Sequence, residues 1–269
     1  MRRLSHAEQY LIGYGVTKPR HIDLEALAWT MGAKVKYKRL SSCEAKITGL
    51  GDRAIITIDD SFGERRARFS LSHEIGHWQR HRNQILSCSK QDIGGVNGKG
   101  AHKEREADRY AADFMMPAYL YRPLMREFKR PSFKSIDALA QEFQASRKAS
   151  ALRYVDVDRS ESMLICFGPN GRKWYRGSKD WPDEWAPKRD HDPDSGVMEL
   201  LFGKTTPGAD RSLVPASAFF GRYSAENHNV YAHSVISRSR GGQTDAEVMT
   251  FIVPQSSAMF DDVYTSRGW

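Results

Sequence analysis

Apolar residues recur at helical intervals in the first 120 residues of the chain. Spacings of three and four residues predict helices with one buried face at two places. The two apolar stripes are Leu71, Ile75 and Trp78, and Ala107, Ala111 and Phe114. Pro117 is expected to end the second of these helices, because proline lacks the N–H group that continues a helix. Shorter helices are predicted over residues 7–14 and 23–31, the latter with Asp23 as its cap.

Short runs rich in β-branched residues predict strands between the helices. They cover residues 35–38 and 54–58, with residues 43–48 as a weaker candidate and a glycine-containing turn over residues 49–52. Residues 92–100 hold several helix-breaking residues and are expected to form a loop between the two longer helices. The first 120 residues are therefore expected to combine helices with a small sheet.

The apolar pattern changes between residues 135 and 155. Apolar spacing over residues 135–155 predicts two short helices separated at Ala145 and Ser146, with Ser146 as the cap of the second. This pair resembles a helix-turn-helix, although a pair of this size is more often a packing element than a reader of DNA. Two hairpins are then expected in the last third of the chain, where strand-like runs flank glycine-containing turns. Their strands are predicted over residues 162–167 and 172–176, and over 230–237 and 247–253.

The fold class predicted from these elements is α+β. We expect a zincin-like helical domain with a small sheet over residues 1–120, a helix-turn-helix-like segment over 121–158 and a β-rich or mixed module over 159–269. Trp174, Trp181 and Trp185 lie between the two hairpins. Burial that anchors a loop is expected for them, with a ligand or partner surface as the alternative.

Composition narrows the class of protein further. The formal net charge of +8 is compatible with nucleic-acid binding, but the basic residues are spread along the chain and no single tract dominates. Lys34, Lys36 and Lys38 fit a strand with one solvated face, with Val35 and Tyr37 expected to point inward. No apolar run is long enough for a membrane helix, and the first residues lack a signal-peptide pattern, so a cytoplasmic protein is expected.

The sequence His73-Glu74-Ile75-Gly76-His77 is the motif that carries the most chemical information. Two histidines four residues apart lie on one helix face and can bind one metal ion together. Glu74 can then act as the general base that takes a proton from a metal-bound water. A shuffled chain of this composition would contain such a motif in roughly one or two cases per hundred. The alternative is that both histidines are ordinary surface or core residues.

A zinc hydrolase site needs a third protein ligand and leaves one position open. Asn83 occupies the place where the metzincin pattern has a histidine. His81 lies two helical turns from His73, so we expect it to support the site from behind, to face the substrate or to be a surface residue near the helix end. Glu106, beside the apolar stripe of the second helix, is the predicted third ligand, with Glu104 as its competitor. Both glutamates could instead be solvated residues near a helix start.

The segments 68–77 and 106–117 resemble the ImmA/IrrE family of bacterial and phage metallo-endopeptidases, in which the second segment reads roughly E-A-N-x-F-A-x-x-L-M-P. Asp108 and Tyr110 replace the usual Asn and Phe. The likeness extends over about residues 20–120. It implies that His73, His77 and Glu106 bind the metal and that Glu74 is the base.

The same resemblance implies a substrate. Members of the family cleave or inactivate helix-turn-helix transcriptional repressors and so release a stress, prophage or mobile-element response. We therefore expect a zinc-dependent endopeptidase, with Mn²⁺ or Fe²⁺ as other possible metals. The alternative is a non-proteolytic regulator or toxin–antitoxin component that binds DNA or protein with the same fold. The oligomeric state is not predicted.

Overall fold

The computed structural model describes residues 4–41, 43–81, 101–203, 206–208, 210–238 and 246–266. The chain forms two compact units, one of Met1–Leu124 with Leu139–Ala149 and the other of Met125–Ala138 with Ser150–Trp269. Helices and small sheets are both present, which confirms the α+β class. The division into domains at residues 120 and 158 stays a prediction. The expected loop over residues 92–100 lies outside the described residues.

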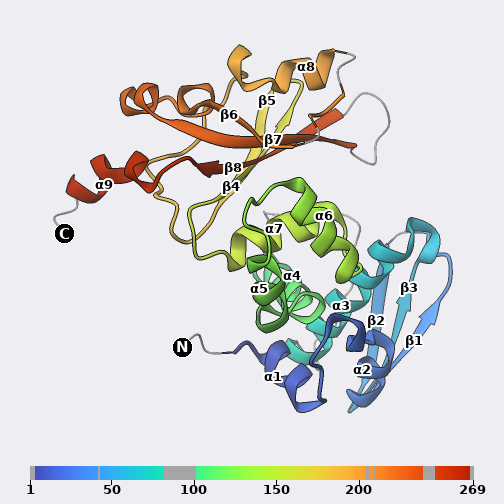
Figure 1. Ribbon diagram of the computed structural model, residues 1–269. Coiled ribbons are helices and arrows are strands. Elements are labelled where there is room, and N and C mark those ends of the chain that lie inside the picture. The colour runs from blue at the N-terminus through green and yellow to red at the C-terminus, as the bar shows by residue number, and fades with distance from the viewer. Residues whose placement is uncertain are drawn as a thin grey trace. The chain divides into compact units, whose positions relative to one another are not determined.

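The first unit combines helices with a three-stranded sheet of order β1-β3-β2. Its elements are α1 (His6–Gly13), α2 (Leu24–Thr30), β1 (Ala33–Tyr37), β2 (Ala45–Leu50), β3 (Arg53–Ile58), α3 (Glu64–Arg80), α4 (Ala101–Met115) and α5 (Ala118–Arg126), except the last two residues of α5. β1 runs parallel to β3, and β2 runs antiparallel to it. α2 contacts β1, and α3 contacts β2 and β3 (Figure 1). The predicted helices and strands of this region are thus present.

Local side-chain bonds explain where the first helices begin. The side chain of Ser5 accepts from the backbone N–H of Glu8, and Glu8 accepts from that of Ser5, so the two form a capping box. The other carboxylate oxygen of the buried Glu8 accepts from the N–H of Ala118 at the start of α5, at 2.8 Å. Asp23 caps α2 as predicted, since its side chain accepts from two backbone N–H groups of the first turn.

Trp78 fixes the position of strand β2 against helix α3. Its indole N–H donates to the carbonyl of Met31 at 2.8 Å, and its ring is buried. A Cβ atom at Gly49 would lie 2.5 Å from that ring, so only glycine allows this close approach. Because β2 pairs with β3 alone among the described residues, the other edge of β2 is an edge of the sheet.

The alternation of exposed and buried residues predicted for β1 is present only in part. Lys34 and Lys36 are exposed as expected, and Val35 is half-buried. Tyr37 is 45% exposed and not inside, because its hydroxyl donates to the carboxylate of Glu25 on α2 at 2.8 Å. A tyrosine has an apolar ring and a polar hydroxyl, so it can occupy an inward position of the strand pattern and still reach solvent at the edge of the sheet.

The later helices and strands build the second unit, apart from the parts of α6 and α7 that belong to the first. They are α6 (Phe133–Glu142), α7 (Arg147–Val157), β4 (Met163–Gly168), β5 (Gly171–Gly177), α8 (Val197–Phe202), β6 (Ser212–Pro215), β7 (Asn229–Arg238), β8 (Ala246–Pro254) and α9 (Asp261–Ser266). The sheet is antiparallel, with order β5-β4-β8-β7-β6. Both predicted pairs of strands are present, although the expected turn between residues 238 and 246 lies outside the described residues. Strand β6 and helices α8 and α9 were not predicted.

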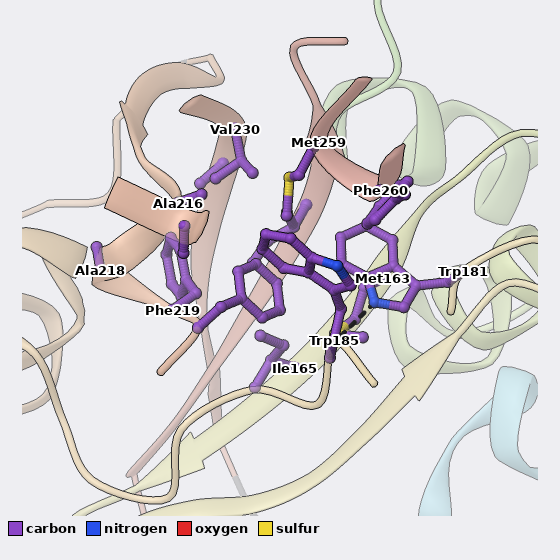
Figure 2. Packing of buried hydrophobic residues seen from close by; sticks show 14 of the residues in the cluster. Met163, Ile165, Trp181, Trp185, Ala216, Ala218, Phe219, Val230, Met259 and Phe260 are labelled. Atoms are coloured by element: carbon purple, nitrogen blue, oxygen red, sulfur yellow. Dashed lines mark hydrogen bonds between the residues drawn. The ribbon is translucent and has the colours of Figure 1, made fainter. Parts of the chain in front are cut away.

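Aromatic residues fill the core of the second unit. Trp181 and Trp185 are 5% and 0% exposed, and their rings contact Phe220 and Phe260. The indole N–H of Trp181 donates to the carbonyl of Trp185 at 3.0 Å, so this loop is tied internally (Figure 2). The expected anchoring by burial is confirmed for these two residues. Trp174, on β5, is only half-buried.

Helices α3 and α4 approach each other closely at Gly76. A Cβ atom there would lie 3.1 Å from the carbonyl oxygen of Ala107 and 3.2 Å from Cβ of Tyr110. Gly76 therefore sets the separation of two helices that carry the candidate site. No helix among the described residues is long and apolar enough to cross a membrane.

Substitution Gly76→Val is expected to lower the free energy of unfolding by about 1–3 kcal/mol, because the added methyl groups overpack the seam between α3 and α4. The matched control is Gly13→Val in α1, where a Cβ atom meets nothing within 4 Å. Urea unfolding measures both. A Gly76→Val protein as stable as the Gly13→Val protein would contradict the proposed close contact.

Candidate metal centre

The motif histidines lie side by side on helix α3. His73, Glu74 and His77 are each 0% exposed. The Nε2 atoms of His73 and His77 are 3.0 Å apart, and the two rings meet edge to face. The four-residue spacing therefore brings two nitrogen donors to one point, as the sequence predicts.

Glu104, on helix α4, supplies the third donor group. One carboxylate oxygen lies 3.2 Å from Nε2 of His73, and the other lies 3.4 Å from Nε2 of His77. The donor atoms chosen from these three residues all lie within 4.8 Å of one another. Two packed helices thus present a His-His-Glu set.

Glu106 is not part of this cluster, so the structure does not bring the predicted third ligand to the histidines. Its carboxylate contacts Nη2 of Arg80 at 2.6 Å and Nε2 of His81 at 3.3 Å. Two residues along a helix correspond to a rotation of about 200°, which turns Glu106 away from the side that Glu104 occupies.

The contact between α3 and α4, and not a pattern in the sequence, separates Glu104 from Glu106. Ala107 lies three residues after Glu104 and is the residue that contacts Gly76 across the α3–α4 seam. Residues three apart share a helix face, so Glu104 lies on the face that meets α3. The apolar stripe alone places Glu106 nearby as well, which is why that pattern did not separate the two glutamates.

The three donor groups fit a tetrahedral metal ion. Ligand bonds of about 2.0–2.1 Å in a tetrahedron place neighbouring donor atoms about 3.3 Å apart. The observed separations of 3.0, 3.2 and 3.4 Å lie around this value. Two imidazoles and one carboxylate are also a donor set that zinc hydrolases use, with the fourth position left for water or substrate.

Each histidine has a partner on its other ring nitrogen. Nδ1 of His73 lies 2.9 Å from a carboxylate oxygen of Asp108, and Nδ1 of His77 lies 3.1 Å from Nδ1 of His81. A carboxylate or other acceptor at this position orients a ligating imidazole and fixes its tautomer. Asp108 therefore orients His73 through a hydrogen bond. From the sequence, this residue was noted only because it replaces the usual Asn.

The electrostatics favour a neutral histidine and an ionised carboxylate. Burial and the neighbouring His73 lower the pKa of His77 to about 4. For Glu104, burial raises the pKa, but hydrogen bonding and charge interaction with the two histidines outweigh it, so the net shift is downward. Neutral imidazole and ionised carboxylate are the forms that bind a metal ion.

His73, His77 and Glu104 therefore form a candidate metal centre. Residues 24–154 match the family model described as the IrrE N-terminal-like domain, of the peptidase M78 family. This match confirms the resemblance to the ImmA/IrrE family that residues 20–120 indicate.

Comparison with solved structures supports the fold over a larger part of the chain. A structure titled "Mycobacterium tuberculosis transcriptional regulator" is similar with a TM-score of 0.62 and 13% sequence identity. The match covers 92% of this chain and 75% of that one. At this identity the likeness concerns the fold alone. No curated protein sequence is significantly similar to the chain.

The metal-free protein is expected to lose stability as the pH falls from about 6.5 to about 4. Within this range the unfolded chain binds a proton at His77, whereas the folded chain, with a pKa of about 4 there, does not. The free energy of unfolding therefore decreases with acidification. Urea titrations at several pH values, with His77→Gln as the comparison, measure the effect. A His77→Gln protein with the same pH slope as the unsubstituted protein would exclude His77 as its source.

Proposed function

We propose that the protein is a zinc-dependent endopeptidase that cleaves a helix-turn-helix transcriptional repressor and thereby releases a stress, prophage or mobile-element response. The observation that carries the enzymatic part is the convergence of His73, His77 and Glu104 beside Glu74, in a segment that matches a metallopeptidase family model. The repressor as substrate rests on the family resemblance.

The ligand roles follow from the donor atoms. His73 and His77 would bind the ion through Nε2, and Glu104 through its carboxylate, in place of the Glu106 inferred from sequence. Zinc is favoured because it tolerates four-coordinate geometry, while Mn²⁺ and Fe²⁺ can use the same donors. A bound zinc ion supplies a Lewis acid that polarises a peptide carbonyl and lowers the pKa of water to about 7.

Glu74 is the proposed general base. It follows His73 directly on α3 and is fully buried with both histidines. Its carboxylate takes the proton from the attacking water and passes it to the amine of the leaving peptide. Burial of Glu74 keeps bulk water from competing for that proton.

Strand β2 offers a place for the substrate backbone. It contacts α3, and one of its edges has no partner strand among the described residues. An extended peptide can add to such an edge through main-chain hydrogen bonds, which bind without regard to side-chain sequence. The Gly49–Trp78 contact holds β2 against α3, so a peptide on this edge would run beside the helix that carries the motif.

Substitution Glu74→Gln is expected to leave zinc binding intact and to reduce cleavage by about 10²–10⁴-fold, because the amide cannot accept the proton. The control is Glu64→Gln, an exposed residue in the first turn of the same helix. The measurements are zinc content by atomic absorption and cleavage of a helix-turn-helix repressor from the same genome, followed by gel electrophoresis and mass spectrometry.

The same assay separates the two functions. Cleavage that stops with a chelator and returns with zinc supports the peptidase. A Glu74→Gln protein that cleaves at the rate of the unsubstituted protein removes the proposed base. Metal-free protein that binds DNA or the repressor without cutting it supports the alternative of a non-proteolytic regulator or toxin–antitoxin component, for which the net charge of +8 is the motivating feature.

Substitutions at the two glutamates of α4 distinguish their roles. Glu104→Gln is expected to weaken zinc binding by more than about 100-fold, because an anionic donor is lost. Glu106→Gln should bind zinc within a few-fold of the unsubstituted protein, since its amide oxygen can still accept a hydrogen bond from His81. Competition with a fluorescent chelator measures both affinities. The reverse order of effects would restore Glu106 as the ligand.

A further inference from the structure

A row of hydrogen-bonded side chains leads away from the metal centre, from His77 through His81 to Glu106. His81 follows the last residue of α3 and is only 6% exposed, so it is not a surface histidine. Its Nδ1 atom lies 3.1 Å from Nδ1 of His77, and its Nε2 atom lies 3.3 Å from a carboxylate oxygen of Glu106. The other oxygen of Glu106 accepts from Nε of Arg80 at 2.7 Å.

The carboxylate at the end of this row determines where the protons lie. A carboxylate only accepts hydrogen bonds, so Nε2 of His81 carries a proton and donates it toward Glu106. In neutral His81 the Nδ1 atom is then the acceptor. It faces Nδ1 of His77, which must therefore carry the proton of that ring. Nε2 of His77, the atom that faces His73 and Glu104, is left with its lone pair.

The opposite direction of hydrogen bonding along the row is unfavourable. If His81 donated from Nδ1, its unprotonated Nε2 would face the carboxylate of Glu106 as a second acceptor. His77 would then carry its proton on Nε2, the atom needed as a metal donor. The ion pair of Glu106 with Arg80 keeps the carboxylate in place as an acceptor, and hydrogen bonding to Arg80 lowers the pKa of Glu106.

We propose that His81 and Glu106 are positioning residues that hold His77 in the tautomer with Nδ1 protonated and Nε2 free to bind the metal. This inference rests on the proposed metal centre and adds to it a specific role for two residues outside the ligand set. Glu106 thus acts on the metal centre only through the rings of His81 and His77. For His73, Asp108 has the corresponding role, because its carboxylate accepts a hydrogen bond from Nδ1.

Zinc affinity of His81 variants tests the inference. His81→Leu is expected to bind zinc about 10–100-fold more weakly, the usual effect of removing a partner of a ligating histidine. His81→Asn should recover most of the affinity, because its side-chain oxygen can stand where Nδ1 stood and accept from His77. His21→Leu, at an exposed histidine, is the matched control. Chelator competition gives the dissociation constants.

Nitrogen NMR of the imidazole rings in metal-free protein gives an independent readout at neutral pH. In the unsubstituted protein, His77 should be present as the Nδ1-protonated tautomer, and His81 as the Nε2-protonated one. In His81→Leu the signals of His77 should move toward the Nε2-protonated tautomer that a histidine side chain prefers in water. A merely structural role for His81 would change stability without changing this tautomer.

The outcomes separate the inference from the proposed function. If the unsubstituted protein binds no zinc, the proposed metal centre fails. If it binds zinc and folded His81→Leu binds it equally well, with the His77 tautomer unchanged, only the positioning role fails. Should His81→Leu not fold, Glu106→Ala is the second variant, since that carboxylate is partly exposed. Its zinc affinity and His77 tautomer are expected to shift in the same direction, and unchanged values overturn the inference.

Discussion

The close approach of α3 and α4 at Gly76 is the constraint on which the candidate site depends. Neither helix contains the site alone: α3 carries the two histidines, and α4 carries Glu104. Because a side chain at position 76 would press on Ala107 and Tyr110, glycine there allows the helices to come near enough for Glu104 to reach both rings. Position 76 is one of the two unspecified residues of the motif, yet it decides whether a third donor can be reached.

The burial of so many polar side chains at this seam needs compensation. Transferring a polar group away from water costs free energy unless it finds a hydrogen-bond partner. His73 has Asp108 and Glu104, and His77 has Glu104 and His81. These partners come from α4 and from the end of α3. The packing of the two helices therefore brings the donor groups together and also supplies hydrogen-bond partners for the buried histidines. The same contacts between α3 and α4 therefore stabilise the helix pair and determine the geometry of the site.

The sequence predicted most local elements but not the orientation of helix α4. Caps such as Asp23 and Ser146 and the apolar stripes are local signals, and the helices they predicted are present. Choosing between Glu104 and Glu106 required knowing which face of α4 meets α3, a tertiary contact made at Ala107. Strand β6 was missed for a similar reason, because four residues beside β7 carry no periodic pattern that is visible before the sheet is formed.

The two histidine supports differ in a way that charge explains. Glu74, Glu104 and Asp108 already bring carboxylates to His73 and its neighbours. A further carboxylate directly on His77 would add a negative charge in a buried region, where charge repulsion is strong. His81 separates Glu106 from His77 by one uncharged ring, and Arg80 neutralises Glu106 at the partly exposed end. Through His81, the carboxylate of Glu106 thus orients His77, while its negative charge stays away from the candidate metal centre.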